Sequence, residues 1–512
     1  MRQLFSILAV IFLLTGCGIN PVTGERELSL VSEQKEIAIG NEQYLASQQM
    51  QGGAYNLDRE LTRYVDTVGQ RLAAVSDRHL PYEFVVLNNS VPNAWALPGG
   101  KIAVNRGLLV ELQNEAELAA VLGHEIIHAA ARHGAKGIER GILLQSVVHA
   151  TGIAAGSDYS QLAVGGASLA AGLISQKYSR DAERESDFYG MQYMSRAGYD
   201  PEAAVTLQET FVRLADNNNQ NWLNGLFASH PPSMERVLAN KQTLKQLPRG
   251  GELGQERYQA KIAPLRKTQD AYEAYDKGRK ALQEGNYELA NSLAAKALSF
   301  ESREALFYGL KADTQYATKN YTNALSLYNN AIDRNSQFFQ FYVQRGLTRK
   351  ELGNLTGAEQ DLQYSLRLLP TATAYNSLGE ISLAKGQRQE AKKYFKAAAP
   401  STSLAGKQAA ASLIKLDFPD NPQAYIKVSH TLDQGNILRV KIENSTPFPV
   451  QDIRIDVIFT DERQKPHQTQ LLVNEVLQGG QALLLPAATT SPLTQYRKNI
   501  RMQVVSARMV DN

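Results

Sequence analysis

The spacing of apolar and polar residues changes along the chain and divides it into four regions. Residues 17–247 mix helical periodicity with a strand-like stretch and glycine-rich turns, which predicts an α+β domain. Residues 248–268 open with a polar, glycine-rich segment and are predicted to form a linker. Residues 269–415 keep a helical period, whereas residues 422–512 switch to a period of two. We therefore expect an α+β domain, a helical domain and a small all-β domain.

The helical region repeats itself. Alanine recurs at intervals of 34, 34 and 33 residues, at Ala290, Ala324, Ala358 and Ala391. A small residue lies twelve positions before each alanine and another lies seven positions after it, so two antiparallel helices can approach closely in every unit. This pattern resembles the tetratricopeptide repeat, and we assign four repeats to residues 269–415. The resemblance implies an α-solenoid whose concave surface docks a protein partner.

The period of two is clearest where Leu438, Val440 and Ile442 alternate with charged residues. Alternation of this kind is typical of strands with one buried face, and a turn segment, Asn444–Pro447, follows. We predict a small antiparallel β-sandwich over residues 422–512. Its sequence offers no residue that suggests catalysis.

The first residues have the pattern of an export signal. Arg2 precedes an apolar run, 4–14, that is shorter than the about 20 residues a bilayer-spanning helix needs. The run ends in Leu-Thr-Gly-Cys17, which resembles the lipobox of bacterial lipoproteins. The resemblance implies that 1–16 is a lipoprotein signal peptide and that Cys17 is acylated; a plain secretory signal is the alternative. Gly18 stands where inner-membrane retention usually requires Asp, so the resemblance places the protein on the periplasmic face of a bacterial outer membrane.

Composition adds little to this picture. The formal net charge of +3 is small for 512 residues, so it gives no case for a nucleic-acid partner. Cys17 is the single cysteine, which excludes an intramolecular disulfide and a cysteine-rich metal site.

The segment from Asn114 to His128 has the spacing of a metal-binding helix. Asn114 with Glu117 three residues later predicts the start of a helix. His124 and His128 are four residues apart, so they lie on one face and both can bind a single Zn²⁺. Glu125 follows the first histidine and is the candidate general base for a water molecule.

A second acidic segment supplies the third ligand that a catalytic zinc needs. Ser179 predicts the start of another helix, on which Glu183 and Asp187 are four residues apart and share a face. We assign Glu183 as the third ligand and Asp187 as the acceptor for a ring N–H of one ligating histidine. Alone, such an acidic helix is more often a solvated surface.

These two segments together resemble the M48 family of zinc peptidases. Two further stretches agree with that family, 93–104 upstream of the first helix and the Ser-His-Pro-Pro-Ser segment 229–233 downstream. The resemblance covers most of residues 20–245 and implies an α+β zincin fold with one Zn²⁺ per chain over residues 17–247. Ser186 departs from the alanine that the family commonly has.

A strand and two basic residues complete the candidate site. Lys101, Ile102, Ala103 and Val104 match the family's edge strand, to which an extended peptide substrate can add as a further strand. A purely structural edge is the alternative. For His230 we leave two roles open, a regulatory fourth ligand that holds the enzyme latent or a donor to the oxyanion, with Arg236 as a second donor candidate. A solvated loop residue without a role in the site is the alternative for His230. His133 lies about 140° round a continued helix from His128, so we expect it to face away from the metal.

The sequence therefore predicts a zinc-dependent endopeptidase that acts on misfolded or stalled periplasmic and outer-membrane proteins. The repeats would dock an envelope protein, and the membrane would be reached through the lipid on Cys17. The alternative is a chaperone or assembly scaffold for outer-membrane proteins whose zinc site is latent or idle.

Overall fold

The computed structural model describes residues 17–140, 167–216, 225–433, 438–460, 466–486 and 500–510. The predicted signal peptide, 1–16, lies outside the described residues. The chain forms two compact units, Met1–Ala374 and Tyr375–Asn512. Among the described helices, none is long and apolar enough to cross a membrane.

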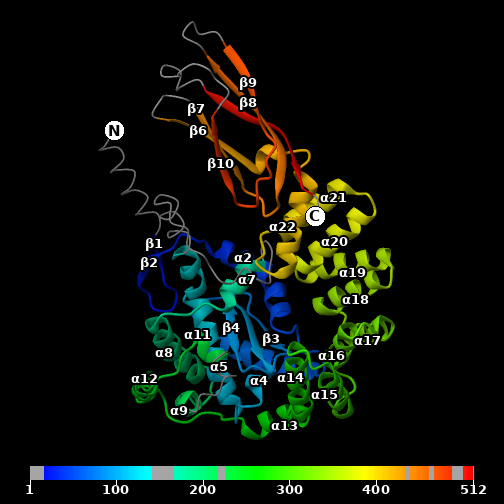
Figure 1. Cartoon of the computed structure of the whole chain (residues 1–512). Helices are drawn as coiled ribbons and strands as arrows, with labels where there is room; N and C mark the ends of the chain where they lie inside the picture. The colour runs from blue at the N-terminus through cyan, green and yellow to red at the C-terminus, as the bar shows by residue number, and fades with distance from the viewer. Residues whose placement is uncertain are drawn as a thin grey trace, which may run out of the picture. The chain divides into compact units, whose positions relative to one another are not determined.

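A small sheet and the helices around it form the first half of unit one. The described sheet has the order β3-β5-β4, with β3 (Glu83–Leu87) parallel and β4 (Ala94–Leu97) antiparallel to β5 (Lys101–Asn105). Figure 1 shows this sheet beside the blue and teal helices of the first unit. The helices of this part are α2 (Glu33–Met50), α3 (Arg59–Ala73), α4 (Arg106–Leu109), α5 (Glu115–Ala130), α7 (Ala167–Ile174), α8 (Arg180–Arg196), α9 (Glu202–Asp216), α11 (Leu226–Ser229) and α12 (Met234–Leu244).

The predicted edge strand is the middle strand of this sheet, so that prediction is wrong. Lys101, Ile102, Ala103 and Val104 pair with β3 on one side and β4 on the other, and all four are buried. The reason is a tight turn at Gly99 and Gly100, both with positive φ, which folds the preceding residues back as β4. A strand hydrogen-bonded on both sides cannot accept a substrate strand.

Most of the predicted linker is a helix, α13 (Gln255–Lys267), that packs into the core of unit one. Tyr258, Ile262 and Leu265 are almost completely buried. Arg257 binds the Glu115 carboxylate at the start of α5 at 2.6 Å, and the Tyr258 hydroxyl donates to the Leu109 carbonyl at 2.6 Å. This helix therefore fixes the entry to α5.

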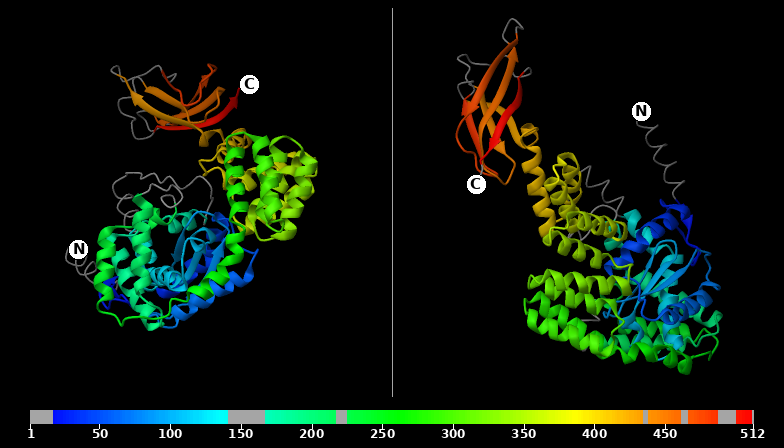
Figure 2. Two further views of the ribbon diagram at one scale, coloured as in Figure 1. Left: turned by 90° about the horizontal axis from the view of Figure 1, so that it is seen from below. Right: turned by 90° about the vertical axis from the view of Figure 1, so that its right-hand side faces the viewer.

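Three helical hairpins follow in unit one and confirm the repeat prediction there. Their helices are α14 (Gln269–Gln283) with α15 (Tyr287–Phe300), α16 (Ala305–Ala317) with α17 (Tyr321–Arg334), and α18 (Phe339–Glu351) with α19 (Leu355–Leu368). Ala290, Ala324 and Ala358 are fully buried, and a Cβ on Gly278 would lie 2.7 Å from the Leu310 side chain. Figure 2 shows the hairpins stacked in green to yellow-green. Gln49 ties them to the peptidase region by bonds to the Gln337 carbonyl and the Phe339 N–H.

The second unit contains the fourth hairpin and the predicted sandwich. Ala391 is fully buried, and a Cβ on Gly379 of α20 (Ala372–Ala384) would lie 2.5 Å from the Phe395 ring of α21 (Arg388–Ala398). After α22 (Leu404–Asp417) and a short 3-10 turn (Pro422–Ala424), the described strands form two antiparallel sheets, β10-β7-β6 and β11-β8-β9. Their bounds are β6 Ile426–Leu432, β7 Leu438–Asn444, β8 Val450–Thr460, β9 Pro466–Val473, β10 Ala482–Pro486 and β11 Arg501–Met509. The alternating apolar residues of both sheets share one core, as the period of two predicts.

Candidate metal centre

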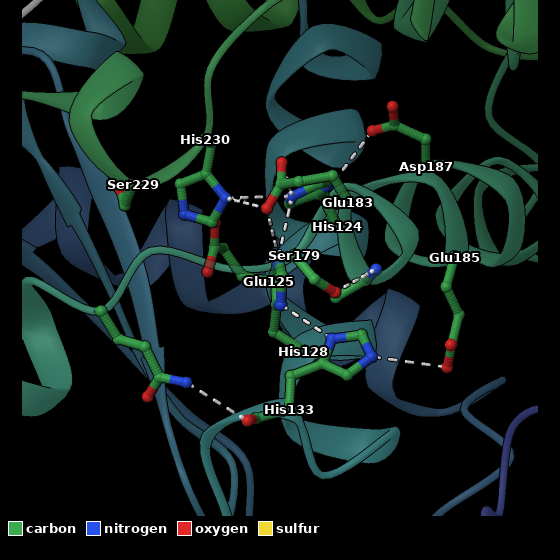
Figure 3. Close-up of polar contacts among 12 residues, drawn as sticks. His124, Glu125, His128, His133, Ser179, Glu183, Glu185, Asp187, Ser229 and His230 are labelled. Atoms are coloured by element: carbon green, nitrogen blue, oxygen red, sulfur yellow. Dashed lines mark hydrogen bonds and ion pairs between the residues drawn. The ribbon is translucent and has the colours of Figure 1, made fainter. Parts of the chain in front are cut away.

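Helix α5 carries the first two metal-facing residues. It begins where the Asn114 side chain accepts the Glu117 N–H at 2.9 Å, as the sequence predicts. All its residues are buried, and the Nε2 atoms of His124 and His128 lie 3.0 Å apart. Two imidazoles one helical turn apart therefore converge on one point (Figure 3).

Helix α8 brings a carboxylate to the same point. Ser179 begins this helix by accepting the Ala182 N–H, and Glu183 is only 2% exposed. The Glu183 oxygens lie 3.4 Å from His128 Nε2 and 3.5 Å from His124 Nε2. Gly123 and Gly190 permit this approach, because a Cβ on either would lie within 3.3 Å of the other helix's backbone.

His230 lies at the end of α11 and completes a group of four. Its Nδ1 lies 3.0 Å from a Glu183 oxygen and 3.3 Å from His124 Nε2. The donor atoms of His124, His128, Glu183 and His230 all lie within 4.8 Å of one another.

The spacing of these donors fits a tetrahedral zinc ion. Bonds of about 2.0–2.1 Å from a central Zn²⁺ place its donors about 3.3 Å apart. The contacts among the four side chains run from 3.0 to 3.5 Å. Three imidazoles and one carboxylate are also ligands that zinc prefers, so the residues fit one zinc ion.

Glu125 lies beside the four donors but forms no hydrogen bond with any described residue. It is 1% exposed, and its Oε1 lies 3.5 Å from His230 Nε2. Burial raises the pKa of Glu125 above its usual value. A buried carboxylate that forms no hydrogen bond with the described residues and has a raised pKa is suited to accept a proton from water.

Asp187 and Arg236 support the donor group from behind. Asp187 accepts from His124 Nδ1 at 2.9 Å, which leaves Nε2 to face the centre, as we predict from the sequence. Burial would raise the pKa of Asp187, but Arg236 holds it below its usual value. Arg236 donates to both Asp187 oxygens at 2.7 Å and lies 2.8 Å from Glu183. Its guanidinium is thus engaged with two carboxylates, which disfavours the oxyanion role considered for Arg236.

His133 lies outside the four donors, as we predict from the sequence, but it contacts His128, which we did not predict. Its Nδ1 lies 2.9 Å from His128 Nδ1, and its Nε2 lies 3.5 Å from Glu185 (Figure 3). The α-helix ends at Ala130, and Arg132 has a φ of 64°, so the chain turns back. With its Nε2 toward the centre, His128 donates its Nδ1–H to His133, which in turn points Nε2–H at Glu185. Both helix histidines therefore have an oriented second nitrogen.

A further ring and a small cavity border the site. Tyr178 stacks on the His128 ring at 3.9 Å between centroids, a contact that the sequence did not predict. Beside His124 and Glu125 lies a cavity of about 50 Å³, lined mainly by apolar side chains from α5, α8, α9 and α11. Such a cavity next to the donor group is suited to an apolar side chain.

Comparisons with known proteins agree with this geometry. The model of Peptidase family M48 matches residues 59–243. The metalloprotease YcaL of Escherichia coli strain K12 is 32% identical over 179 residues, which cover 33% of this chain and 67% of YcaL.

Two longer relatives are described as beta-barrel assembly-enhancing proteases. The putative protease of this name from Vibrio cholerae serotype O1 is 30% identical over 206 residues, covering 37% of this chain and 40% of the relative. The protease of this name from E. coli K12 is 26% identical over 335 residues, covering 58% of this chain and 67% of the relative. The chain thus spans less than two thirds of the length of the Vibrio relative.

Proposed function

Because this chain belongs to peptidase family M48, we propose that it is a zinc-dependent endopeptidase with one metal ion held by His124, His128 and Glu183. The observation that carries the proposal is the spacing of those donor atoms, 3.0 to 3.5 Å, around one point. A bound Zn²⁺ would supply a Lewis acid that polarises the scissile carbonyl and acidifies water.

Glu125 is the proposed general base. Its carboxylate is buried beside the donors, and a proton taken from water there can be delivered to the leaving amine. Asp187 and His133 hold the rings of His124 and His128 in the required orientation. Arg236 pairs with both Asp187 and Glu183 and holds the pKa of Asp187 below its usual value against the effect of burial.

We propose that His230 acts as a fourth ligand that keeps the site latent. Its Nδ1 lies 3.0 Å from Glu183 and 3.3 Å from His124, which is the position of a ligand and leaves little room for the attacking water. Substrate would then have to displace the His230 segment. The role as an oxyanion donor predicts the reverse outcome: His230→Ala raises activity if the residue is a latency ligand and lowers it if the residue stabilises the oxyanion.

The substrates we propose are misfolded or stalled periplasmic and outer-membrane proteins. The support is the similarity to two proteases described as enhancing β-barrel assembly. We propose further that a lipid on Cys17 attaches the chain to the periplasmic face of the outer membrane and that the repeats dock an envelope protein. Incorporation of labelled palmitate, lost in Cys17→Ser, tests the attachment.

Glu125→Gln tests the catalytic proposal. This change removes the base but keeps the shape, so zinc content should stay at one per chain while cleavage of unfolded casein falls by about 10²–10⁴-fold. Wild-type cleavage with zinc retained would exclude the mechanism. The alternative function as a scaffold is favoured by the position of His230, which already occupies the fourth place in the donor group. Complementation of a deletion strain distinguishes the two functions, because full rescue by the Glu125→Gln chain would support the scaffold.

A further inference from the structure

The hairpin next to the proposed lipid site has two different faces. Strand β1 (Cys17–Ile19) pairs antiparallel with β2 (Arg26–Leu28), so that Cys17 lies opposite Leu28 and Ile19 opposite Arg26. Because side chains alternate along a strand, Ile19, Arg26 and Leu28 share one face, and Gly18 and Glu27 share the other.

The face with Gly18 and Glu27 is fastened to the segment that follows α5. Lys136 lies 2.6 Å from the Glu27 carboxylate, and the Ser29 hydroxyl accepts from Arg132. Just beyond β2, the N–H groups of residues 30 and 31 donate to Glu139 at 2.9 and 3.0 Å. These contacts fix the hairpin against the peptidase region, so Cys17 is not at the end of a free tether.

The opposite face is apolar and exposed. Ile19 is 66% exposed, Leu28 41%, and Leu30, which continues the alternation, 45%. Arg26 is exposed on the same face. One exposed aliphatic residue is ordinary, but three around an acylation site, with a cation beside them, match an interface of acyl chains and lipid phosphates.

We infer that this face, made of Ile19, Arg26, Leu28 and Leu30, lies in the headgroup region of the membrane that the Cys17 lipid enters. The inference rests on the proposed attachment at Cys17. Ile19 is two residues from Cys17, about 7 Å along the strand, and Leu28 lies directly across, about 5 Å away. Apolar faces at a membrane surface lie about 5–10 Å deep, at the boundary between headgroups and acyl chains. Once the acyl chains on Cys17 enter the bilayer, the side chains of Ile19 and Leu28 are close enough to lie at this boundary.

This contact sets the position of the metal centre relative to the lipid. Asn20, which follows β1, donates to Glu185 at 3.2 Å, and Glu185 lies 3.5 Å from His133, the partner of His128. A hairpin seated on lipid therefore holds the catalytic residues close to the membrane surface, where a substrate emerging from or entering the bilayer can reach them.

A single-thiol label tests the inference in the full acylated protein. Cys17 is the only cysteine, and acylation turns its thiol into a thioether, so Ile19→Cys or Leu28→Cys provides one reactive thiol. The matched control is Leu289→Cys, 47% exposed on α15, across the first unit from the hairpin (Figures 1 and 2). Each variant is labelled with acrylodan and reconstituted into vesicles of phosphatidylethanolamine and phosphatidylglycerol.

We expect the labels at 19 and 28 to shift their emission to the blue and to lose quenching by aqueous iodide, while the label at 289 stays fully quenched. If the chain incorporates palmitate but all three labels are quenched equally, the hairpin inference fails and the attachment stands. If the wild-type chain incorporates no palmitate, the attachment and the inference both fail.

Discussion

Replacement of His133 by phenylalanine should weaken zinc binding without unfolding the protein. Phenylalanine keeps a ring in a site that is 3% exposed, but it removes the nitrogen that lies 2.9 Å from His128 Nδ1. The His128 ring would then lose the acceptor that fixes its tautomer and its rotation about the side-chain bonds.

The size of the effect follows from burial. Because the position is buried, water cannot replace the lost acceptor, and the affinity for zinc should fall by about 10- to 100-fold, the usual effect of removing the hydrogen-bond partner of a metal-binding histidine. That range corresponds to about 1.4–2.7 kcal/mol. Glu185→Gln keeps an acceptor oxygen next to His133 but removes its charge, so a smaller loss is expected.

The assay is competition for Zn²⁺ against a chelator of known affinity. His79→Phe is the matched control, because His79 is exposed and outside the site. Circular dichroism of the metal-free variants checks that both are folded. Equal zinc affinities for folded His133→Phe and His79→Phe would refute the supporting role of His133.

Four further predictions follow, three from the contacts of the metal centre and one from the packing of the repeats. Burial would lower the pKa of His124, but hydrogen bonds to Asp187 and Glu183 raise it to about 10 in the metal-free protein. Zinc binding at pH 8 should therefore release about one proton from His124. Calorimetry in two buffers of different ionisation enthalpy measures this release. Because that folded-state pKa lies above the usual histidine pKa of 6.5, the metal-free protein should also lose stability as pH rises from 6.5 to about 10; flat stability over this range would contradict the raised pKa. Arg236→Met removes the cation that pairs with the buried carboxylates of Asp187 and Glu183 and should lower the unfolding free energy of the metal-free protein by about 3–5 kcal/mol in denaturant titrations, whereas an unchanged midpoint would show that these two ion pairs contribute nothing. Gly379→Ala should cost about 1–3 kcal/mol because its Cβ meets Phe395, while Gly172→Ala, with nothing within 4 Å, should not destabilise; equal effects would contradict the packing argument.

The parts of the site that sequence predicts are those set by local helical geometry. His124 and His128 share a helix face because of their spacing, and Asp187 reaches His124 one turn beyond Glu183. The repeats were predictable for a similar reason, since a buried alanine every 34 or so residues marks each hairpin.

The parts that failed depend on where an element ends and on what it pairs with. The contact of His133 with His128 was missed because the predicted helix was extended past Ala130, and no local sequence signal indicates the positive φ at Arg132. The pairing of β5 with β3 joins residues 18 apart, and a local hydrophobic period cannot predict it. The glycine pair at 99 and 100 is a hairpin signal that could have predicted the pairing of β5 with β4. In α13, Tyr258, Ile262 and Leu265 had helical spacing, but the polar residues around them favoured a linker.

Zinc X-ray absorption of the purified wild-type chain measures the coordination on which the proposed function depends. We predict one zinc per chain, bound by nitrogen and oxygen donors at about 2.0–2.2 Å with scattering from three imidazoles. In His230→Ala the imidazole count should fall to two while zinc is retained. A chain that binds no zinc, or a wild-type spectrum without imidazole scattering, would contradict this prediction.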